Sequence, residues 1–141
     1  MANSDVCIFC EIIAGKIPCH KIYEDDNVIS FLDIGPISSG HTLVVPKQHF
    51  VRVDQCPEDV ISKISVCISN VSKAVLTATE ADGYNVLCNN GRAAGQIVDH
   101  VHFHIVPRYD NDGLFNQWPS DEYPEGQGKV VADSIREKLV K

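Results

Sequence analysis

The chain has 141 residues, of which 44% are hydrophobic and 22% are charged, and its net charge is −7. This length suits one domain, residues 1–141, with a single core. The negative charge argues against a broad basic surface, so we expect no nucleic-acid partner. The apolar runs are too short to span a bilayer and residues 1–13 lack a signal-peptide pattern. We therefore expect a cytoplasmic protein with no membrane partner.

Six cysteines are present, and without a secretion signal we expect them to be reduced. Four are scattered along the chain and suit small buried positions: Cys19, Cys56, Cys67 and Cys88. Cys7 and Cys10 differ, because they form a CxxC pair. This spacing is typical of paired metal ligands, and it is also typical of a redox pair at a helix N-terminus.

The N-terminal third predicts a short helix and then three strands. The helix starts near Cys7 and stops at Gly15. Residues 20–34 predict two strands around the polar turn EDDN. Residues 35–40, rich in glycine and serine, predict a loop, and residues 41–46 predict a buried strand.

The longest predicted element is a helix over residues 57–80. Its apolar residues recur at steps of three and four, as one core-facing stripe: Val60, Ile64, Cys67, Val71, Ala74 and Ala78. A strand over 84–90, a small-residue loop over 91–96 and a strand over 99–109 follow. The polar tail, residues 110–141, predicts a last helix from about residue 129. Neighbouring strands and one long helix predict an α+β fold with a mostly antiparallel sheet on that helix.

The segment DHVHFHIVPRY, residues 99–109, holds three of the six histidines at alternate positions. In a strand, His100, His102 and His104 project to one face and the apolar residues between them to the other. Solvated polar residues on a wet sheet face are the simplest explanation. Three functional explanations compete with it: metal binding, acid–base catalysis and nucleophilic catalysis.

The heptapeptide HVHFHIV, residues 100–106, matches the H-φ-H-φ-H-φ-φ signature of the histidine triad (HIT) family, where φ is apolar. Three other segments also resemble this family: CIFCEIIAGKIP with KIYEDDN, FLDIGPISSGHTLVVPKQH, and NVLCNNGRAAGQ. Together they span about residues 7–109. The resemblance implies a HIT-like fold, with a five-stranded sheet, one long helix and short terminal helices.

The resemblance also implies a hydrolase or transferase that acts on the α-phosphate of a nucleotide, such as an adenosine phosphoramidate or a dinucleoside polyphosphate. The middle histidine, His102, would attack phosphorus and form a covalent nucleotidyl-histidine. His104 would contact the phosphate and help to protonate the leaving group. The alternative is a nucleotide-binding interaction module with little turnover. The family usually forms a homodimer, which we carry over as an expectation.

The matched segments assign further nucleotide-binding positions, namely Phe31, Asp33, Ile34, His41, Asn89, Gly95 and Gln96. By resemblance, Asp33 takes the ribose hydroxyls, while Phe31 and Ile34 line the base pocket. Asp33 could instead cap a turn, Asn89 could be an ordinary turn residue, and Phe31 and Ile34 could be core residues. Ile97 departs from one family branch, which has a hydroxyl residue there, so the preferred leaving group is left open.

Members with the N-terminal CxxC resemble a zinc-binding subset of the family. The resemblance completes the ligand set with His49 and the first triad histidine, so that Cys7, Cys10, His49 and His100 would hold a structural zinc ion. Four protein ligands leave no open position for a catalytic water, which argues against a zinc hydrolase. We expect no organic cofactor.

Overall fold

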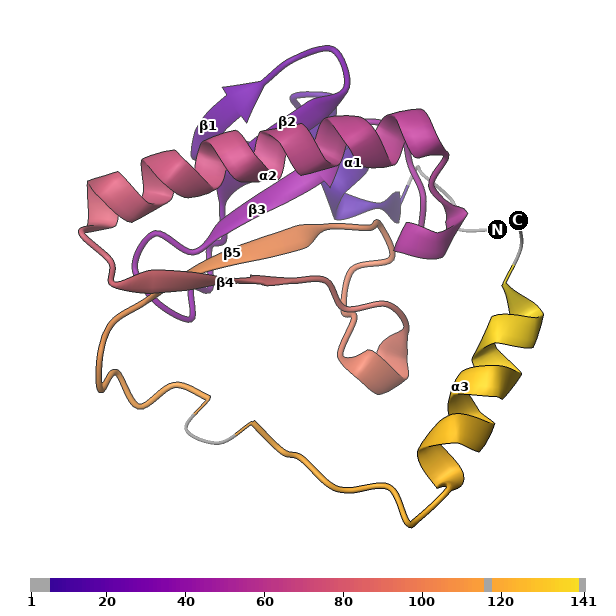
Figure 1. Cartoon of the computed structure of the whole chain (residues 1–141). Helices are drawn as coiled ribbons and strands as arrows, with labels where there is room; N and C mark the ends of the chain where they lie inside the picture. The colour runs from indigo at the N-terminus through magenta and orange to yellow at the C-terminus, as the bar shows by residue number, and fades with distance from the viewer. Residues whose placement is uncertain (1–5, 116–117, 140–141) are drawn as a thin grey trace.

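The computed structural model describes residues 6–115 and 118–139. Its elements are α1 (Ile8–Ile13), β1 (Lys21–Glu24), β2 (Val28–Leu32), β3 (Thr42–Pro46), a short 3₁₀ turn (Val53–Gln55), α2 (Glu58–Thr79), β4 (Gly83–Leu87), a second 3₁₀ turn (Arg92–Ala94), β5 (Phe103–Arg108) and α3 (Gln127–Lys138). The five strands form one sheet in the order β1-β2-β3-β5-β4, and every neighbouring pair is antiparallel (Figure 1). The predicted α+β fold is confirmed.

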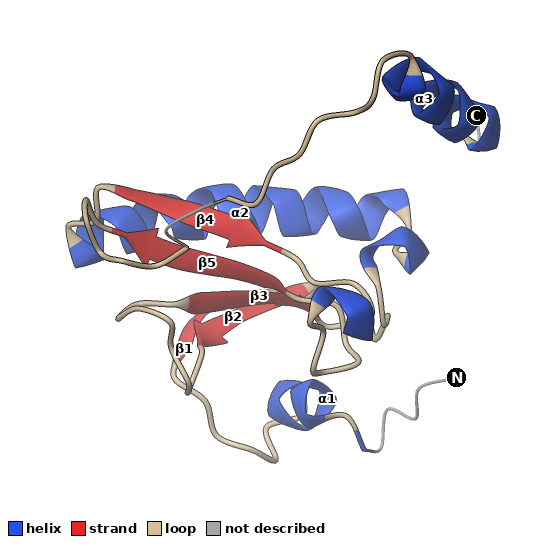
Figure 2. Cartoon of the chain, turned by 90° about the horizontal axis from the view of Figure 1, so that it is seen from below, coloured by secondary structure: helices blue, strands red, loops and turns tan. Residues whose placement is uncertain are grey.

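Alternating side chains divide the molecule into two apolar layers. On one face of the sheet, Val28 and Ile105 pack with residues of α2. On the other face, Ile29 and Leu43 pack with α1, and Figure 2 shows the two helices on opposite sides of the sheet. Since successive strand residues point to opposite faces, His104, next to Ile105, is placed on the α1 side. The α1 face is therefore the one that carries the histidines.

Helix α2 covers the other face, and its buried stripe differs in part from the predicted one. Ile64, Cys67 and Val71 are buried, as the periodicity predicts. Ala74 and Ala78 are exposed, and Val75 continues the stripe instead. The step of four from Val71 to Val75 keeps a branched side chain over the sheet, where a larger apolar area is buried. By length and composition α2 could also cross a membrane, but its buried residues pack on the sheet, as in a core helix.

The histidine segment is a strand over only part of its predicted length, because β5 begins at Phe103. Before that point the backbone is held from outside the sheet, since the Val101 N–H donates to the Phe50 carbonyl at 2.7 Å. Strand β3 pairs with β5 at three positions, the last of which joins Val44 to Phe103. The prediction of a strand from residue 99 was wrong. His100 and His102 lie in the approach to the strand.

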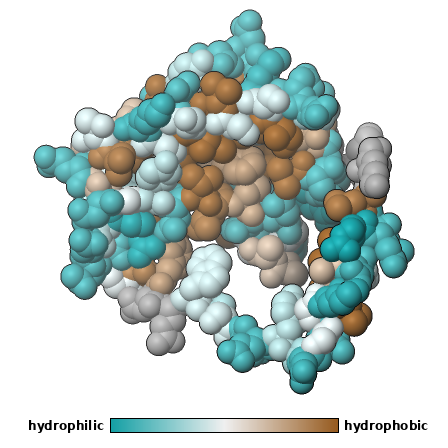
Figure 3. Space-filling model, viewed as in Figure 1, coloured by the Kyte–Doolittle hydropathy of each residue, from teal (hydrophilic) through white to brown (hydrophobic). Residues whose placement is uncertain are grey.

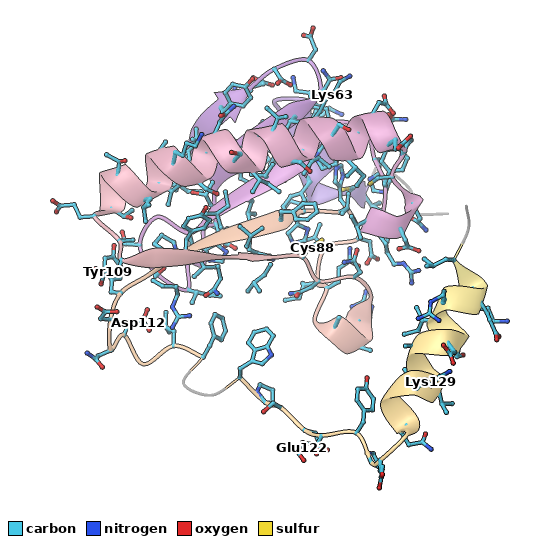
Figure 4. The ribbon with its side chains drawn as sticks, in the orientation of Figure 1. Lys63, Cys88, Tyr109, Asp112, Glu122 and Lys129 are labelled. Atoms are coloured by element: carbon cyan, nitrogen blue, oxygen red, sulfur yellow. The ribbon has the colours of Figure 1, made fainter. Side chains whose placement is uncertain are left out.

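The tail leaves the body of the molecule after a turn at residues 110–111, directly before Asp112. This carboxylate accepts hydrogen bonds at 2.8 Å from the guanidinium of Arg108, which holds the pKa of Asp112 well below its usual range. Figure 4 shows Tyr109 and Asp112 beside the sheet, and Glu122 and Lys129 far out along the tail. The last helix is present, as the sequence predicts, but none of its described residues is buried.

We predict that Val71→Ala lowers the free energy of unfolding by about 2 kcal/mol, because two buried methyl groups are lost from the α2 layer. Val66→Ala is the matched control, since Val66 lies on the same helix with 62% of its surface exposed, against 5% for Val71. Urea denaturation measures both. Equal losses in the two variants would contradict this description of the core.

Candidate functional site

Four potential metal ligands from distant parts of the chain meet at the N-terminus of α1. Cys7 caps the helix and Cys10 lies in its first turn. His49 follows β3, and His100 precedes β5. The ligand atoms lie close together: Cys7 Sγ is 3.4 Å and Cys10 Sγ 3.6 Å from His100 Nδ1, Cys10 Sγ is 3.4 Å from His49 Nδ1, and the two Nδ1 atoms are 3.1 Å apart.

These separations suit one tetrahedral metal ion. Metal–sulfur and metal–nitrogen bonds of about 2.3 and 2.0 Å imply tetrahedral edges of about 3.3–3.8 Å. The Pro46 carbonyl lies 2.8 Å from His100 Nε2 and can only accept a hydrogen bond. Nε2 therefore carries the proton, and the lone pair of Nδ1 faces the cluster. Burial raises the pKa of Cys10 to about 11, and a bound dication would oppose this shift by favouring the thiolate.

His102 has the arrangement that a nucleophilic imidazole needs. Its Nδ1 is 2.7 Å from the carbonyl oxygen of His100, which can only accept, so Nδ1 carries the proton. The other ring nitrogen, Nε2, keeps its lone pair and makes no hydrogen bond to the described residues. The ring is 7% exposed, and burial lowers its pKa, so it stays neutral at pH 7. A neutral ring with an oriented free lone pair is the reactive form.

A second chain of hydrogen bonds sets the tautomers of His41 and His104. The Ile37 N–H donates to His41 Nδ1 at 3.0 Å, so the proton of His41 lies on Nε2. His41 Nε2 is 2.9 Å from His104 Nδ1 and donates to it. His104 consequently carries its proton on Nε2. Burial, and then the rings of His102 and His41, lower the pKa of His104 to about 4.

The same tautomers decide whether a metal ion fits beside Asp33, His41 and His104, a second close group of potential ligands. The Asp33 carboxylate is 3.6 Å from His41 Nε2. Because the backbone N–H of Ile37 occupies Nδ1, the neutral ring of His41 offers an N–H on Nε2 and no lone pair. This second group is therefore a poor cation site.

A cavity of about 360 Å³ lies on the α1 face, and His102 and His104 line one part of it. Its other walls are mostly apolar, and Phe31, Ile34, Asp33, Asn89 and Gly95 also line it. A larger hollow of about 670 Å³ lies between β1 and α2, but it contains no histidine. The smaller cavity is the one that combines apolar walls with polar groups at one end, as a small-molecule site does.

The residues predicted for nucleotide binding take different places around this cavity. Asp33 does cap a turn, since its Oδ1 accepts from the Gly35 N–H at 2.8 Å, while Oδ2 lies toward His41. Phe31 is buried and belongs to the core layer as well as to the cavity wall. Ile34 is 90% exposed and is no core residue.

Gln96 holds the loop before the histidines in shape. Its Oε1 accepts from the Gly91 N–H at 2.7 Å, and its Nε2 donates to the carbonyls of Val51 at 2.7 Å and Val98 at 3.0 Å. Gly95 has a φ of +89°, a conformation that favours glycine. The side chain of Gln96 is thus fully engaged with backbone, and it shapes the cavity through the loop.

Phe9 is the site residue that sequence reasoning missed. Its ring lies edge-on to His102, with ring centroids 5.0 Å apart, and it also lines the cavity. The only signal for it was its position between Cys7 and Cys10 at the start of a helix.

Comparison with protein families gives a match to the HIT domain over residues 14–111, which is most of the chain. The chain belongs to the HIT family. HIT relatives include an adenosine 5'-monophosphoramidase of Candida albicans, 40% identical over 100% of this chain and 96% of its own length. Another is an adenylylsulfatase of Arabidopsis thaliana, 43% identical over 82% of this chain and 57% of its own length.

Solved HIT structures confirm the fold. A HIT family member from Bacillus subtilis superposes with a TM-score of 0.90 at 39% identity, covering 96% of this chain and 99% of that one. A zinc-bound histidine triad protein from Mycobacterium smegmatis superposes with a TM-score of 0.75 at 35% identity, covering 96% of each chain.

We predict that the stability of the wild-type protein falls more steeply between pH 7 and pH 5 than that of His104→Gln. The lowered pKa of His104 means that the unfolded chain takes up a proton below about pH 6.5 while the folded chain does so only near pH 4. Since the ring is partly exposed, we expect a difference of about 1 kcal/mol. Urea denaturation of both metal-loaded proteins at the two pH values measures it, and parallel pH dependences would contradict the assignment.

Proposed function

We propose that this HIT protein acts on adenosine nucleotides whose α-phosphate carries a leaving group. It breaks the bond from the α-phosphorus to that group and transfers the adenylyl group to water or to another acceptor. The observation that carries the proposal is the hydrogen bond from His102 Nδ1 to the His100 carbonyl, which leaves Nε2 free beside the cavity. The activities of the two relatives support this class of reaction, because the substrates of an adenosine 5'-monophosphoramidase and of an adenylylsulfatase share an adenylyl group and differ in the leaving group. A phosphoramidate is our first choice of substrate, since the phosphoramidase is similar over the whole chain.

In the first step, the lone pair of His102 Nε2 forms a bond to the α-phosphorus, and the bond from phosphorus to the leaving group breaks. The electron pair departs with the leaving group, which takes up one proton from solvent. The ring of His102, now bonded at Nε2 and protonated at Nδ1, carries a positive charge that the His100 carbonyl stabilises. In the second step, water attacks phosphorus, the bond to Nε2 breaks, and one proton returns to solvent.

His104 acts in this scheme as a hydrogen-bond donor. In a bound substrate, its Nε2–H would donate to a phosphate oxygen or to the departing atom and so stabilise the charge that develops there. It is a poor source of the proton itself, because His41 already donates to Nδ1 and a neutral ring would become an anion. We assign the ribose hydroxyls to Asp33, which lines the cavity and lies at the other end of this chain of contacts, 3.6 Å from His41 Nε2.

We predict that His102→Ala lowers kcat for an adenosine 5'-phosphoramidate by at least about 10⁴-fold, because no other described nitrogen near the cavity has a free, oriented lone pair. The Kd for AMP should change much less. Steady-state kinetics and calorimetric titration measure the two quantities. Turnover within tenfold of wild type would exclude His102 as the nucleophile.

We further propose that the ion held by Cys7, Cys10, His49 and His100 is zinc, with a structural role. Two thiolates and two imidazoles at tetrahedral spacing are a typical closed zinc site. The zinc-bound relative from Mycobacterium smegmatis supports the choice. When bound, zinc would cross-link the start of α1 to His49, which follows β3, and to His100, which precedes β5.

We predict one equivalent of zinc per chain in the purified protein, measured by elemental analysis. Cys10→Ser removes a ligand and should lose most of the metal and melt at a lower temperature. Cys88→Ser is the control, since Cys88 lies outside the cluster. Zinc-free wild-type protein, or equal metal content in the two variants, would contradict the proposal.

A homodimer completes the proposal. Strand β4 is an edge strand whose Tyr84 and Val86 are 44% and 41% exposed, and Figure 3 shows apolar residues gathered on the face that carries α2 and β4. An exposed apolar edge favours pairing with a second copy. The solution mass tests this: 15.5 kDa, the mass of one chain, would argue against a dimer.

A further inference from the structure

Phe9 touches a metal ligand, the candidate nucleophile and the wall of the cavity at once. The ring is 6% exposed, and its centroid lies 5.9 Å from that of His100 and 5.0 Å from that of His102. It also meets the ring of Phe31 edge-on at 5.6 Å. Such edge-to-face contacts have a preferred geometry, so a displacement of one ring changes the packing of the neighbouring rings.

His100 provides a second link, through its backbone. Its ring is held at Nδ1 by the sulfur atoms and at Nε2 by the Pro46 carbonyl. The carbonyl oxygen of His100 accepts a hydrogen bond from His102 Nδ1–H, with a nitrogen–oxygen distance of 2.7 Å. Any movement of the His100 backbone therefore moves the group that orients His102.

Helix α1 has only six residues, which is too short for a helix to be stable by itself. Its position depends on tertiary contacts. Two of the four cluster ligands, Cys7 and Cys10, lie at its start, and Ile8, Phe9 and Ile12 line the cavity. A metal ion that joins Cys7 and Cys10 to His49 and His100 would fix this wall in place.

We infer that metal occupancy of the Cys7, Cys10, His49 and His100 cluster is thermodynamically coupled to nucleotide binding, with Phe9 as the positioning residue that transmits the coupling. The inference rests on the proposed function, because it describes regulation of the same cavity. Coupling between two sites is reciprocal, so the nucleotide strengthens metal binding by the factor by which the metal strengthens nucleotide binding. Loss of the metal weakens the nucleotide site without altering any atom that reacts.

The test compares the Kd of AMP for the zinc-loaded protein and for the protein stripped by a chelator, with circular dichroism to confirm that the stripped chain is folded. We expect binding about five- to tenfold weaker without metal, at the lower end of typical coupling between sites. Equal affinities in two folded forms would overturn the inference. Failure of the zinc-loaded protein to bind AMP would instead overturn the proposed function, so the two failures are distinguishable.

Cobalt(II) substitution keeps the test decisive if the stripped chain unfolds. The visible absorption of cobalt bound by two sulfurs and two nitrogens reports ligand geometry. We expect saturating AMP to shift this spectrum in the wild type and in Val66→Ala, which truncates an exposed residue of α2 that lines neither the cavity nor the cluster. In Phe9→Leu, which keeps all four ligands, the shift should be lost at saturating AMP. An unchanged spectrum in wild-type protein saturated with AMP, or an undiminished shift in Phe9→Leu, would contradict the role of Phe9.

Discussion

The chemistry of this protein depends on where each neutral imidazole keeps its single proton. In His102 and His100 a backbone carbonyl decides this, at 2.7 Å from Nδ1 in the first and at 2.8 Å from Nε2 in the second. In His41 a backbone N–H donates to Nδ1, so the proton of this ring lies on Nε2. Because the backbone is fixed by the sheet and its loops, the fold itself decides which nitrogen of each ring keeps the lone pair: Nδ1 in His100 and Nε2 in His102, while His104 carries its proton on Nε2.

Burial makes this assignment effective. Removing an imidazole from water disfavours its charged form, and the pKa of His100 and of His104 falls to about 4. The rings therefore remain neutral at pH 7, and a neutral ring has one donor and one acceptor with fixed directions. Buried polar groups without partners are costly, and Nδ1 of His102, of His104 and of His41 each has a partner. Among the described residues, His49 Nε2 is fully buried without a partner, while Nε2 of His102 and of His104, two residues that line the cavity, also makes no hydrogen bond.

The sequence predicted most of the fold because its signals are local. The short apolar runs of β2 and β3 indicate buried strands, and the alternation in the histidine segment and the step of three and four in α2 place side chains on faces without knowledge of distant contacts. The prediction was wrong where distant contacts decide. The contact from Val101 to Phe50 delays the start of β5, and Val75 replaces Ala74 on the inner face of α2.

The sequence likewise predicted most residues of the candidate site but not all of their contacts. The alternating histidines and the CxxC pair pointed to the residues that the structure brings together as a cluster and a cavity wall. Phe9 and the structural role of Gln96 were not predictable, because Phe9 meets His102 and Gln96 bonds to Val51 across long stretches of the chain. A phenylalanine in a short helix carries no sign that it will meet His102, and a glutamine carries no sign that Val51 and Gly91 will use all its polar atoms.

The central claim is that His102 Nε2 becomes bonded to the phosphorus of the substrate. Rapid mixing with an adenosine 5'-phosphoramidate, an alkaline quench that preserves a phosphorus–imidazole bond, and peptide mass spectrometry test it most directly. The expected result is an adenylyl adduct that fragmentation of the peptide assigns to His102 rather than to His104, formed and lost at rates consistent with turnover. Turnover with no adduct at any time, or an adduct confined to His104 or His41, would contradict it.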